Sequence, residues 1–294
     1  CTWCMLMRRE TLAILNCTYK FIHSHRNEVS ILPIEVRREL SDISAILPLL
    51  RTNLEMDWHS VVHASDASPS GLGACARHLQ PESVGALGRT SELWRFKTLN
   101  AVQARRSALG LSVPPRDYRP GDLDALDPSL PYLSDAQLLD NDDELRCTIQ
   151  SFSEIPQEVV SAEHWKVIHM SRLKHDMFIT KAEGHALVLS YKHALRSVSA
   201  FGKRILGLVD NMTLCLAVTR GRSSSGMLIG TCQRICALSL ASGSRLSTRW
   251  IPSELNIADG PSRGVPRPHG CTNNSKTSDL LFTSTSSSPP STSS

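Results

Sequence analysis

The fold is decided by residues 61–74, which read Val-Val-His-Ala-Ser-Asp-Ala-Ser-Pro-Ser-Gly-Leu-Gly-Ala. The β-branched Val61 and Val62 favour a strand, the Ser-Pro-Ser-Gly run favours a tight turn, and the residues after it predict a second strand. Asp66 would then stand at the end of a central strand, where its carboxylate could help to hold a divalent cation. The competing interpretation is local, since an Asp before such a run commonly forms an Asx turn.

The composition is that of a globular protein, with 41% hydrophobic and 20% charged residues in a chain of 294. No apolar run is long enough to cross a bilayer, and no secretory signal is evident, so we expect no membrane partner. Nine cysteines occur without a disulfide framework or the paired spacing of a zinc site. We therefore expect reduced thiols and an intracellular location, with cytoplasm and nucleus equally open.

Charge is distributed unevenly along the chain, although the net charge is only +4. Residues 121–157 are almost entirely acidic among their charged positions, whereas basic residues dominate 166–222. A solvated surface is the default interpretation of such charge. A more specific interpretation is that the basic half binds a polyanionic partner, and the uneven distribution of charge favours it.

The pattern of apolar residues predicts an α/β fold with a mixed sheet flanked by helices. Residues 1–58 are expected to be helical, with strands following in a hairpin at 58–78 and at 164–169, 203–209 and 245–251. Helices are predicted at 180–200, 212–219 and 227–241. Residues 79–160, crowded with prolines and acidic residues, are expected to be a partly disordered insertion that loops out, with short helices near 92–99 and 135–140. The Ser/Thr-rich residues 265–294 are expected to be a disordered tail.

Four carboxylates fall at the ends of these predicted elements. Asp66 and Asp210 each follow a strand, Glu183 lies in the first turn of a helix, and Asp259 lies in the final turn. If the two strands are neighbours, the four side chains meet at one edge of the sheet, where divalent cations would relieve their repulsion. A pair of Mg²⁺ ions at such a site can activate water and stabilise the leaving oxygen of a phosphodiester.

Each of these carboxylates also has a purely structural interpretation. Thr-Lys-Ala-Glu at 180–183 is a capping-box pattern, in which Glu183 would only bond to the backbone. Asp210 could cap the helix that follows it, and Asp259, before Gly-Pro-Ser, could be a turn residue. The order and context of all four, rather than any single one, favour the metal site.

Four short motifs carry a resemblance to a known family. They read Ser-Asp-Ala-Ser at 65–68, Ile-Thr-Lys-Ala-Glu at 179–183, Val-Asp-Asn at 209–211 and Trp-Ile-Pro-Ser-Glu-Leu-Asn-Ile-Ala-Asp-Gly-Pro-Ser-Arg at 250–263. Together they resemble the ribonuclease H (RNase H) domain of retrotransposon polyproteins, most of all those of DIRS-like elements. Residues 33–58 resemble the stretch that joins the reverse transcriptase to this domain. The resemblance covers 33–78 and 160–264, about half of the chain.

The resemblance implies an RNase H-like mixed sheet and an endoribonuclease that hydrolyses the RNA strand of RNA–DNA hybrids by two-metal catalysis. The family's Asp, Glu, Asp, Asp pattern falls on Asp66, Glu183, Asp210 and Asp259, which would be catalytic and would bind two Mg²⁺ ions, with Mn²⁺ as the alternative. The residues expected to meet the hybrid are Ser68, Ser70, Gly71, Asn211, Arg220 and Arg222. Lys192 and Arg196 could contact phosphates of the hybrid, or they could equally form a solvated face of their helix.

The same resemblance implies a domain organisation. Residues 1–58 would end a reverse-transcriptase connection, and 59–264 would form the RNase H-like domain, with 79–160 inserted into it. The upstream reverse-transcriptase domain of the same polyprotein is then an expected partner, so the chain would be a piece of a longer protein.

Two features keep an alternative open. Asp66 and Glu183 are much farther apart in sequence than in the compact family domain, and the chain contains no Tyr-x-Asp-Asp motif of a polymerase. The alternative is a catalytically inactive retroelement relic that acts at most as a nucleic-acid-binding module. A transposase or integrase on the same fold is disfavoured, because such an enzyme would place its Glu after the second Asp.

Overall fold

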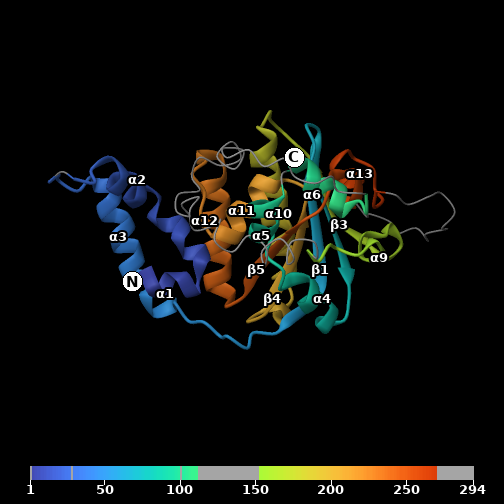
Figure 1. Cartoon of the computed structure of the whole chain (residues 1–294), viewed down its shortest axis with the longest axis horizontal. Coiled ribbons are helices and arrows are strands. Elements are labelled where there is room, and N and C mark those ends of the chain that lie inside the picture. The colour runs from blue at the N-terminus through green and yellow to red at the C-terminus, as the bar shows by residue number, and fades with distance from the viewer. Residues whose placement is uncertain (1, 28, 100, 112–151, 270–294) are drawn as a thin grey trace, which may run out of the picture.

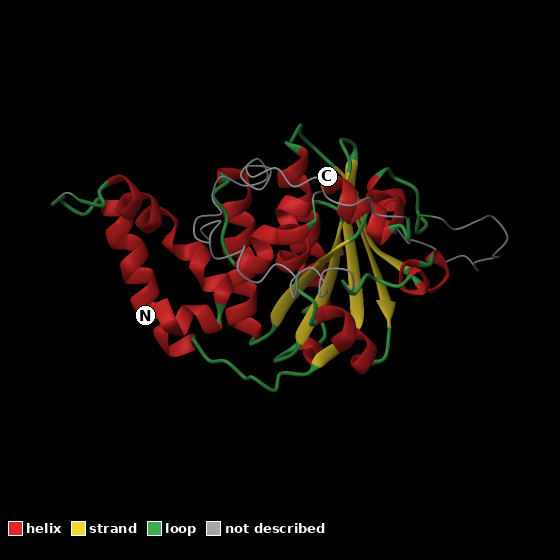
Figure 2. Ribbon diagram, in the orientation of Figure 1, coloured by secondary structure: helices red, strands yellow, loops and turns green. Residues whose placement is uncertain are grey.

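A five-stranded mixed sheet lies at the centre of the protein (Figures 1 and 2). The computed structural model describes residues 2–27, 29–99, 101–111 and 152–269. The strand order is β3-β2-β1-β4-β5. The bounds of the strands are β1 (Trp58–Ala67), β2 (Gly71–His78), β3 (Lys166–Arg172), β4 (Arg204–Val209) and β5 (Arg245–Trp250). This confirms the predicted α/β class, an RNase H-like mixed sheet flanked by helices.

The pairing of the strands brings the ends of β1 and β4 to the same edge of the sheet. The predicted hairpin is present, since β1 and β2 pair antiparallel with Asp66 opposite Gly73. β4 runs parallel to β1, with Ala64 opposite Leu208, and β5 runs parallel to β4. The condition that the sequence left open, that the strands of Asp66 and Asp210 are neighbours, is therefore met.

Three helices cover one face of the sheet, which we call the α10 face (Figure 1). They are α10 (Ile179–Ala194), α11 (Met212–Arg220) and α12 (Gly226–Ser242). Apolar side chains of alternate β4 residues, Ile205 and Val209, pack with Leu187 and Tyr191 of α10 in the main core. The predicted helix over 180–200 is shorter than expected, because it ends at Ala194 and a separate 3-10 turn, η4 (Val198–Ala200), follows.

The opposite face of the sheet, the α4 face, is covered by the segment that the sequence predicts to loop out. Its elements on this face are α4 (Pro81–Gly88) and α9 (Gln157–Val160), and η3 (Ala162–His164) follows directly after it. Val84 and Leu87 of α4 pack with Val62, Leu206 and Leu208 in a second core. The described parts of the 79–160 insertion are therefore integral to the fold, which corrects the prediction that it loops out.

Two more helices of this segment are α5 (Glu92–Thr98) and α6 (Ala101–Ala108), and α5 confirms the short helix predicted near 92–99. The helix expected at 135–140 and the tail beyond 269 lie outside the described residues.

A buried ion-pair network ties α5 to β5. The carboxylate of Glu92 is completely buried and accepts hydrogen bonds from Arg95 Nε and Arg249 Nε, each at 2.6 Å. It also accepts one from the backbone amide of Trp250 at 3.2 Å. Arg95 pairs in addition with Glu154 at 2.7 Å. Because both buried guanidinium groups have carboxylate partners, the network can exist without an isolated buried charge.

The N-terminal residues are helical, as predicted, and lie against α12 (Figure 1). Their elements are α1 (Thr2–Met7), η1 (Arg9–Leu15), α2 (Asn16–Ser24), α3 (Ile34–Ile46) and η2 (Leu47–Leu49). They form a small core of their own, and Arg8 Nη2 joins them to the sheet domain by donating to the carbonyls of Ser239 at 3.0 Å and Ser244 at 3.3 Å. Within the described ranges no helix has both the length and the apolar character needed to cross a membrane.

Candidate active site

Asp66 is buried near the end of β1, with only 5% of its surface exposed. The turn that follows is closed by Ser68, whose Oγ accepts from the amides of Ser70 at 3.2 Å and Gly71 at 3.1 Å. Ser68 therefore performs the turn-forming role that was the structural alternative for Asp66. Burial, and then the negative charges of Asp210 and Asp259, raise the pKa of Asp66 to about 7.

Glu183 projects from α10 toward the residue that follows Asp210. The helix begins at Ile179 without a side-chain cap, so the capping-box interpretation is not met, and Glu183 lies one residue beyond the expected first turn. Its Oε2 instead accepts a hydrogen bond from Asn211 Nδ2. Burial, followed by the charge of Asp210, raises the pKa of Glu183 to about 7, and Asp66 adds to the effect.

Asp210 directly follows β4 and does not cap the next helix. Asn211 is the N-cap of α11, because its Oδ1 accepts from the amide of Leu214 at 2.8 Å. The Asp210 side chain instead lies near the polar side chains of Asn256 and Ser253. Burial raises the pKa of Asp210, and the charge of Asp259 acts in the same direction.

Asp259 opens the short helix α13 (Asp259–Ser262), which packs against β2 and β3. Its Oδ1 accepts a hydrogen bond from Arg263 Nε at 2.8 Å, and its Oδ2 lies 3.7 Å from His269 Nδ1. The close packing of this helix depends on Gly73, because a Cβ there would lie 2.5 Å from both Ala258 O and Ser262 N. Asp259 is more exposed than Asp66, and its negative charge helps to raise the pKa values of Asp66 and Asp210.

Each of the four predicted carboxylates lies within the electrostatic range of others, although they come from four separate elements. Asp66 experiences the charges of Asp210 and Asp259, and Glu183 experiences those of Asp210 and Asp66. Among the described residues, no three His, Cys, Asp or Glu side chains are already grouped so that they could hold a metal ion. The four carboxylates therefore form an electrostatic cluster rather than a closed coordination shell.

The sequence reasoning missed the residue that links this cluster, Asn256. It is completely buried just before α13, and its Nδ2 lies 3.3 Å from Ser65 O and 3.4 Å from Asp66 Oδ1. It also lies near the carboxylate of Asp210, and its Oδ1 accepts from the amide of Ala258 at 3.1 Å. Asn256 stood in the most specific motif at 250–263, but no role was assigned to it.

The chemistry of the donor set fits Mg²⁺. Every candidate ligand is a carboxylate oxygen, the hard donor that Mg²⁺ prefers, and the described surroundings contribute no thiol. Buried carboxylates that raise one another's pKa are stabilised in their charged form by a bound cation. The residues that would hold the ion are Asp66, Glu183, Asp210 and Asp259.

The residues predicted to meet nucleic acid fall into two groups. Ser70 is exposed on the turn beside the cluster, whereas Ser68 is buried and donates to Ser262 O at 2.7 Å, and Gly71 is also buried. Asn211 lies within the cluster as the partner of Glu183. The structure does not bring the other two residues to the cluster, because Arg220 ends α11 and Arg222 lies beyond it, with its guanidinium over Tyr19. Contact of all six with a nucleic acid stays a prediction.

Comparisons with known proteins leave the family of this chain open. No family model matches the sequence, and no curated protein matches it. One solved structure that resembles it is a foamy viral protease-reverse transcriptase in complex with an RNA/DNA hybrid, with a TM-score of 0.27 and 12% identity. The aligned region covers 86% of this chain and 45% of that one. The TM-score is too low for fold or function to be inferred from this similarity.

Proposed function

We propose that this protein is an RNase H-type endoribonuclease that hydrolyses the RNA strand of RNA–DNA hybrids. The observation that carries the proposal is the cluster itself: Asp66, Glu183, Asp210 and Asp259 come from four elements to one edge of the sheet, in the order that the sequence resemblance implies. Their burial and mutual repulsion are costly for folding, which is expected where carboxylates serve a cation.

The carboxylates of Asp66 and Asp210 are central to the proposed site, because each lies within the field of the other and both lie beside Asn256, which donates to Asp66. Two Mg²⁺ ions would supply an activated water and stabilise the departing oxygen of the phosphodiester. Asn211 would orient the carboxylate of Glu183, and Asn256 would position the carboxylates of Asp66 and Asp210. To Ser70, which is exposed on the turn after Asp66, we assign the contact with the ribose 2′-hydroxyl that distinguishes RNA from DNA.

The origin that we propose is a retroelement polyprotein, in which residues 1–58 end the connection from a reverse transcriptase and 59–264 form the nuclease domain. The contacts of Arg8 with α12 support a fixed junction between these two parts.

The test is Mg²⁺-dependent cleavage of a labelled RNA–DNA hybrid by the whole chain. We expect RNA cleavage that Asp66→Asn and Asp210→Asn each reduce by at least a hundredfold, with duplex DNA left intact. The matched control is Asp42→Asn, which removes an exposed carboxylate of α3 and is expected to leave the rate unchanged. A folded protein that fails to cleave, or whose cleavage is indifferent to both substitutions, would favour the inactive relic.

A further inference from the structure

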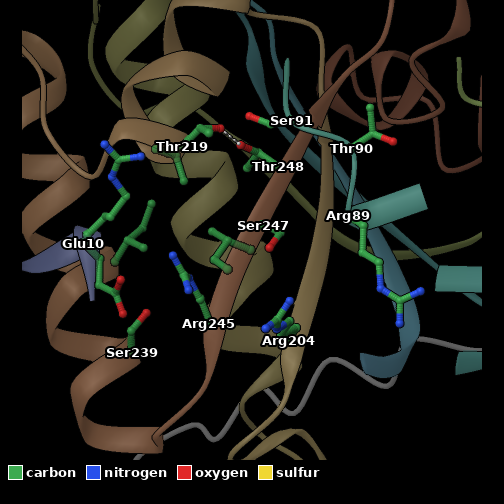
Figure 3. Close-up of a pocket in the computed structure, with 15 residues that line it drawn as sticks. Glu10, Arg89, Thr90, Ser91, Arg204, Thr219, Ser239, Arg245, Ser247 and Thr248 are labelled. Atoms are coloured by element: carbon green, nitrogen blue, oxygen red, sulfur yellow. Dashed lines mark hydrogen bonds between the residues drawn. The ribbon is translucent and has the colours of Figure 1, made fainter. Parts of the chain in front are cut away.

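A second polar site lies along the free edge of β5, which is the last strand of the sheet. A pocket of about 260 Å³ is found there, lined by η1 and α12 on one side and by the loop between α4 and α5 on the other (Figure 3). None of the four carboxylates of the candidate active site lines it. The pocket is therefore a separate feature that the proposed catalytic role does not use.

Four arginines from separate segments line this pocket: Arg9 lies in η1, Arg89 follows α4, Arg204 begins β4 and Arg245 begins β5. Figure 3 labels the last three. Within the described residues none of them is paired with an Asp or Glu. Burial, and then the charges of Arg245 and Arg89, lower the pKa of Arg204. Arg204 thus lies within the field of two other arginines, and no Asp or Glu among the described residues pairs with any of the three.

The position of Arg204 is fixed in spite of that repulsion. Its Nη2 donates to Leu54 O at 3.4 Å, and its guanidinium lies over the Trp58 ring at 5.7 Å from the ring centroid. Its Nε is buried and has no hydrogen-bond partner among the described residues. A guanidinium that is held in place and still has an unused donor is suited to an anion.

The rest of the lining also suits a phosphate group. Six hydroxyl groups line the pocket beside the arginines, and those of Thr219, Ser239 and Thr248 already hydrogen-bond within the fold. The hydroxyls of Thr90, Ser91 and Ser247 are left for a ligand. The acidic side chain in the lining is that of Glu10, which is engaged by Arg8 Nε at 2.7 Å. Guanidinium and hydroxyl donors, with the carboxylate neutralised, are the groups that bind phosphate oxygens.

We propose that this arginine pocket binds a phosphate of a nucleic-acid strand, at the end of β4 opposite to the carboxylate cluster. Arg204 begins β4 and Asp210 follows it, so the two sites are roughly 20 Å apart at about 3.3 Å per residue. A strand of a duplex advances roughly 3.4 Å per nucleotide, so the pocket meets the backbone about six nucleotides from the cluster. The identification of this strand as part of an RNA–DNA hybrid rests on the proposed function. The binding of phosphate by the pocket is independent of it.

The test is the affinity of the whole chain for labelled RNA–DNA hybrids, measured by fluorescence anisotropy in EDTA so that no cleavage occurs. The variant is Arg89→Gln with Arg245→Gln, because neither side chain makes a hydrogen bond or ion pair with another described residue, so the fold should persist. We expect about a tenfold loss of affinity for a long hybrid, and little change for a hybrid too short to span both sites. The slope of log affinity against log salt concentration should correspond to about two fewer phosphate contacts. The control, Arg26→Gln with Arg38→Gln, removes two exposed charges from the N-terminal helices and should bind normally.

The remaining outcomes separate the sources of phosphate. Inorganic phosphate should raise the melting temperature of the wild type but not that of the Arg89/Arg245 variant. If it does so while hybrid affinity is unchanged, the pocket binds a small phosphate and the nucleic-acid proposal is wrong. If neither ligand distinguishes the variant, the pocket is not a phosphate site. If the whole chain binds the hybrid through these arginines but does not cleave it with Mg²⁺ present, the proposed nuclease function is wrong and the phosphate-binding proposal is still supported.

Discussion

At the scale of single residues, Asn256 is the side chain on which the candidate site depends most. It is buried, it donates to the carboxylate of Asp66, and it lies near that of Asp210. An amide is suited to this position because it can donate to carboxylates without adding a further negative charge. Asp66 and Asp210 are thereby held near one another although their charges repel.

Replacing Asn256 with Ala is expected to reduce both stability and cleavage. The substitution removes the donor to the buried carboxylate of Asp66 and to the carbonyl of Ser65, and should lower the free energy of unfolding by about 1–3 kcal/mol. It should also slow hybrid cleavage by about tenfold or more, because small misplacements of catalytic groups are costly. Denaturant unfolding and single-turnover cleavage measure the two effects. Asn27→Ala, at an exposed turn, is the control, and equal behaviour of the two variants would contradict this role.

The raised pKa values of Asp66 and Glu183, both about 7, predict a pH dependence of stability in the absence of divalent cations. Between the ordinary carboxyl value near pH 4 and pH 7, the folded protein binds protons that the unfolded chain has released. The stability that these groups contribute is therefore present below about pH 4 and is lost as the pH rises through 7.

The melting temperature in EDTA should accordingly fall between about pH 5 and pH 8, and should fall less in Asp66→Asn. Millimolar Mg²⁺ at about pH 8 should restore it in the wild type, because the cation binds the charged form of the folded protein. Thermal unfolding followed by circular dichroism measures all of these. A melting temperature that is insensitive to both pH and Mg²⁺ would contradict the raised pKa values and the cation site together.

At the scale of elements, the described helices of the insertion act as part of the sheet domain. Glu92 of α5 joins Arg95, Arg249 and the amide of Trp250, and the indole Nε1 of Trp250 donates to Asp210 O at 2.8 Å. The inserted helix is thereby connected to the backbone of a candidate catalytic residue. This connection explains why a segment with weak apolar periodicity is nevertheless ordered.

Glu92→Gln is expected to lower the free energy of unfolding by about 3 kcal/mol or more, because it leaves the buried Arg249 without its carboxylate partner. The matched control is Glu82→Gln on the exposed side of α4. Urea unfolding compares the two variants. A change of less than about 0.5 kcal/mol for Glu92→Gln would show that the insertion is dispensable for the fold.

The packing of α13 on β2 yields another prediction at this scale. A Cβ at Gly73 would overlap backbone atoms of Ala258 and Ser262. Gly73→Ala should therefore displace α13 together with Asp259, lower the unfolding free energy by about 1–3 kcal/mol and slow cleavage. Gly230→Ala, in α12 with open space around it, should instead stabilise the protein by about 0.5–1 kcal/mol. If Gly73→Ala behaves like Gly230→Ala, the α13 contact is not as close as described.

At the scale of the whole molecule, the sequence predicts the sheet well because its strands carry strong local signals. Val61 and Val62 before a Ser-Pro-Ser-Gly turn indicate the β1–β2 hairpin, and the apolar run before Asp210 indicates β4. The sequence could not decide whether Asp210 or its neighbour caps α11. That choice depends on which side chain reaches the amide of Leu214, and Asn211 does.

The insertion was harder to predict for a different physical reason. Its helices α4, α5 and α6 each have eight residues or fewer, which is too short for a clear helical period. Nothing in the sequence indicates that Glu92 and Arg95 are buried; in the structure they are buried because Glu92 pairs with both Arg95 and Arg249. Long-range pairing of this kind, like the role of Asn256, becomes visible only when distant segments are assembled.

The central claim is that Asp66, Glu183, Asp210 and Asp259 form a divalent-cation site, and anomalous X-ray diffraction from crystals of the whole chain soaked in Mn²⁺ tests it most directly. We expect anomalous density between the carboxylates of Asp66 and Asp210, and we expect this density to be lost in crystals of Asp66→Asn. Well-ordered carboxylates without such density at saturating Mn²⁺, or Mn²⁺ bound only elsewhere on the protein, would contradict it.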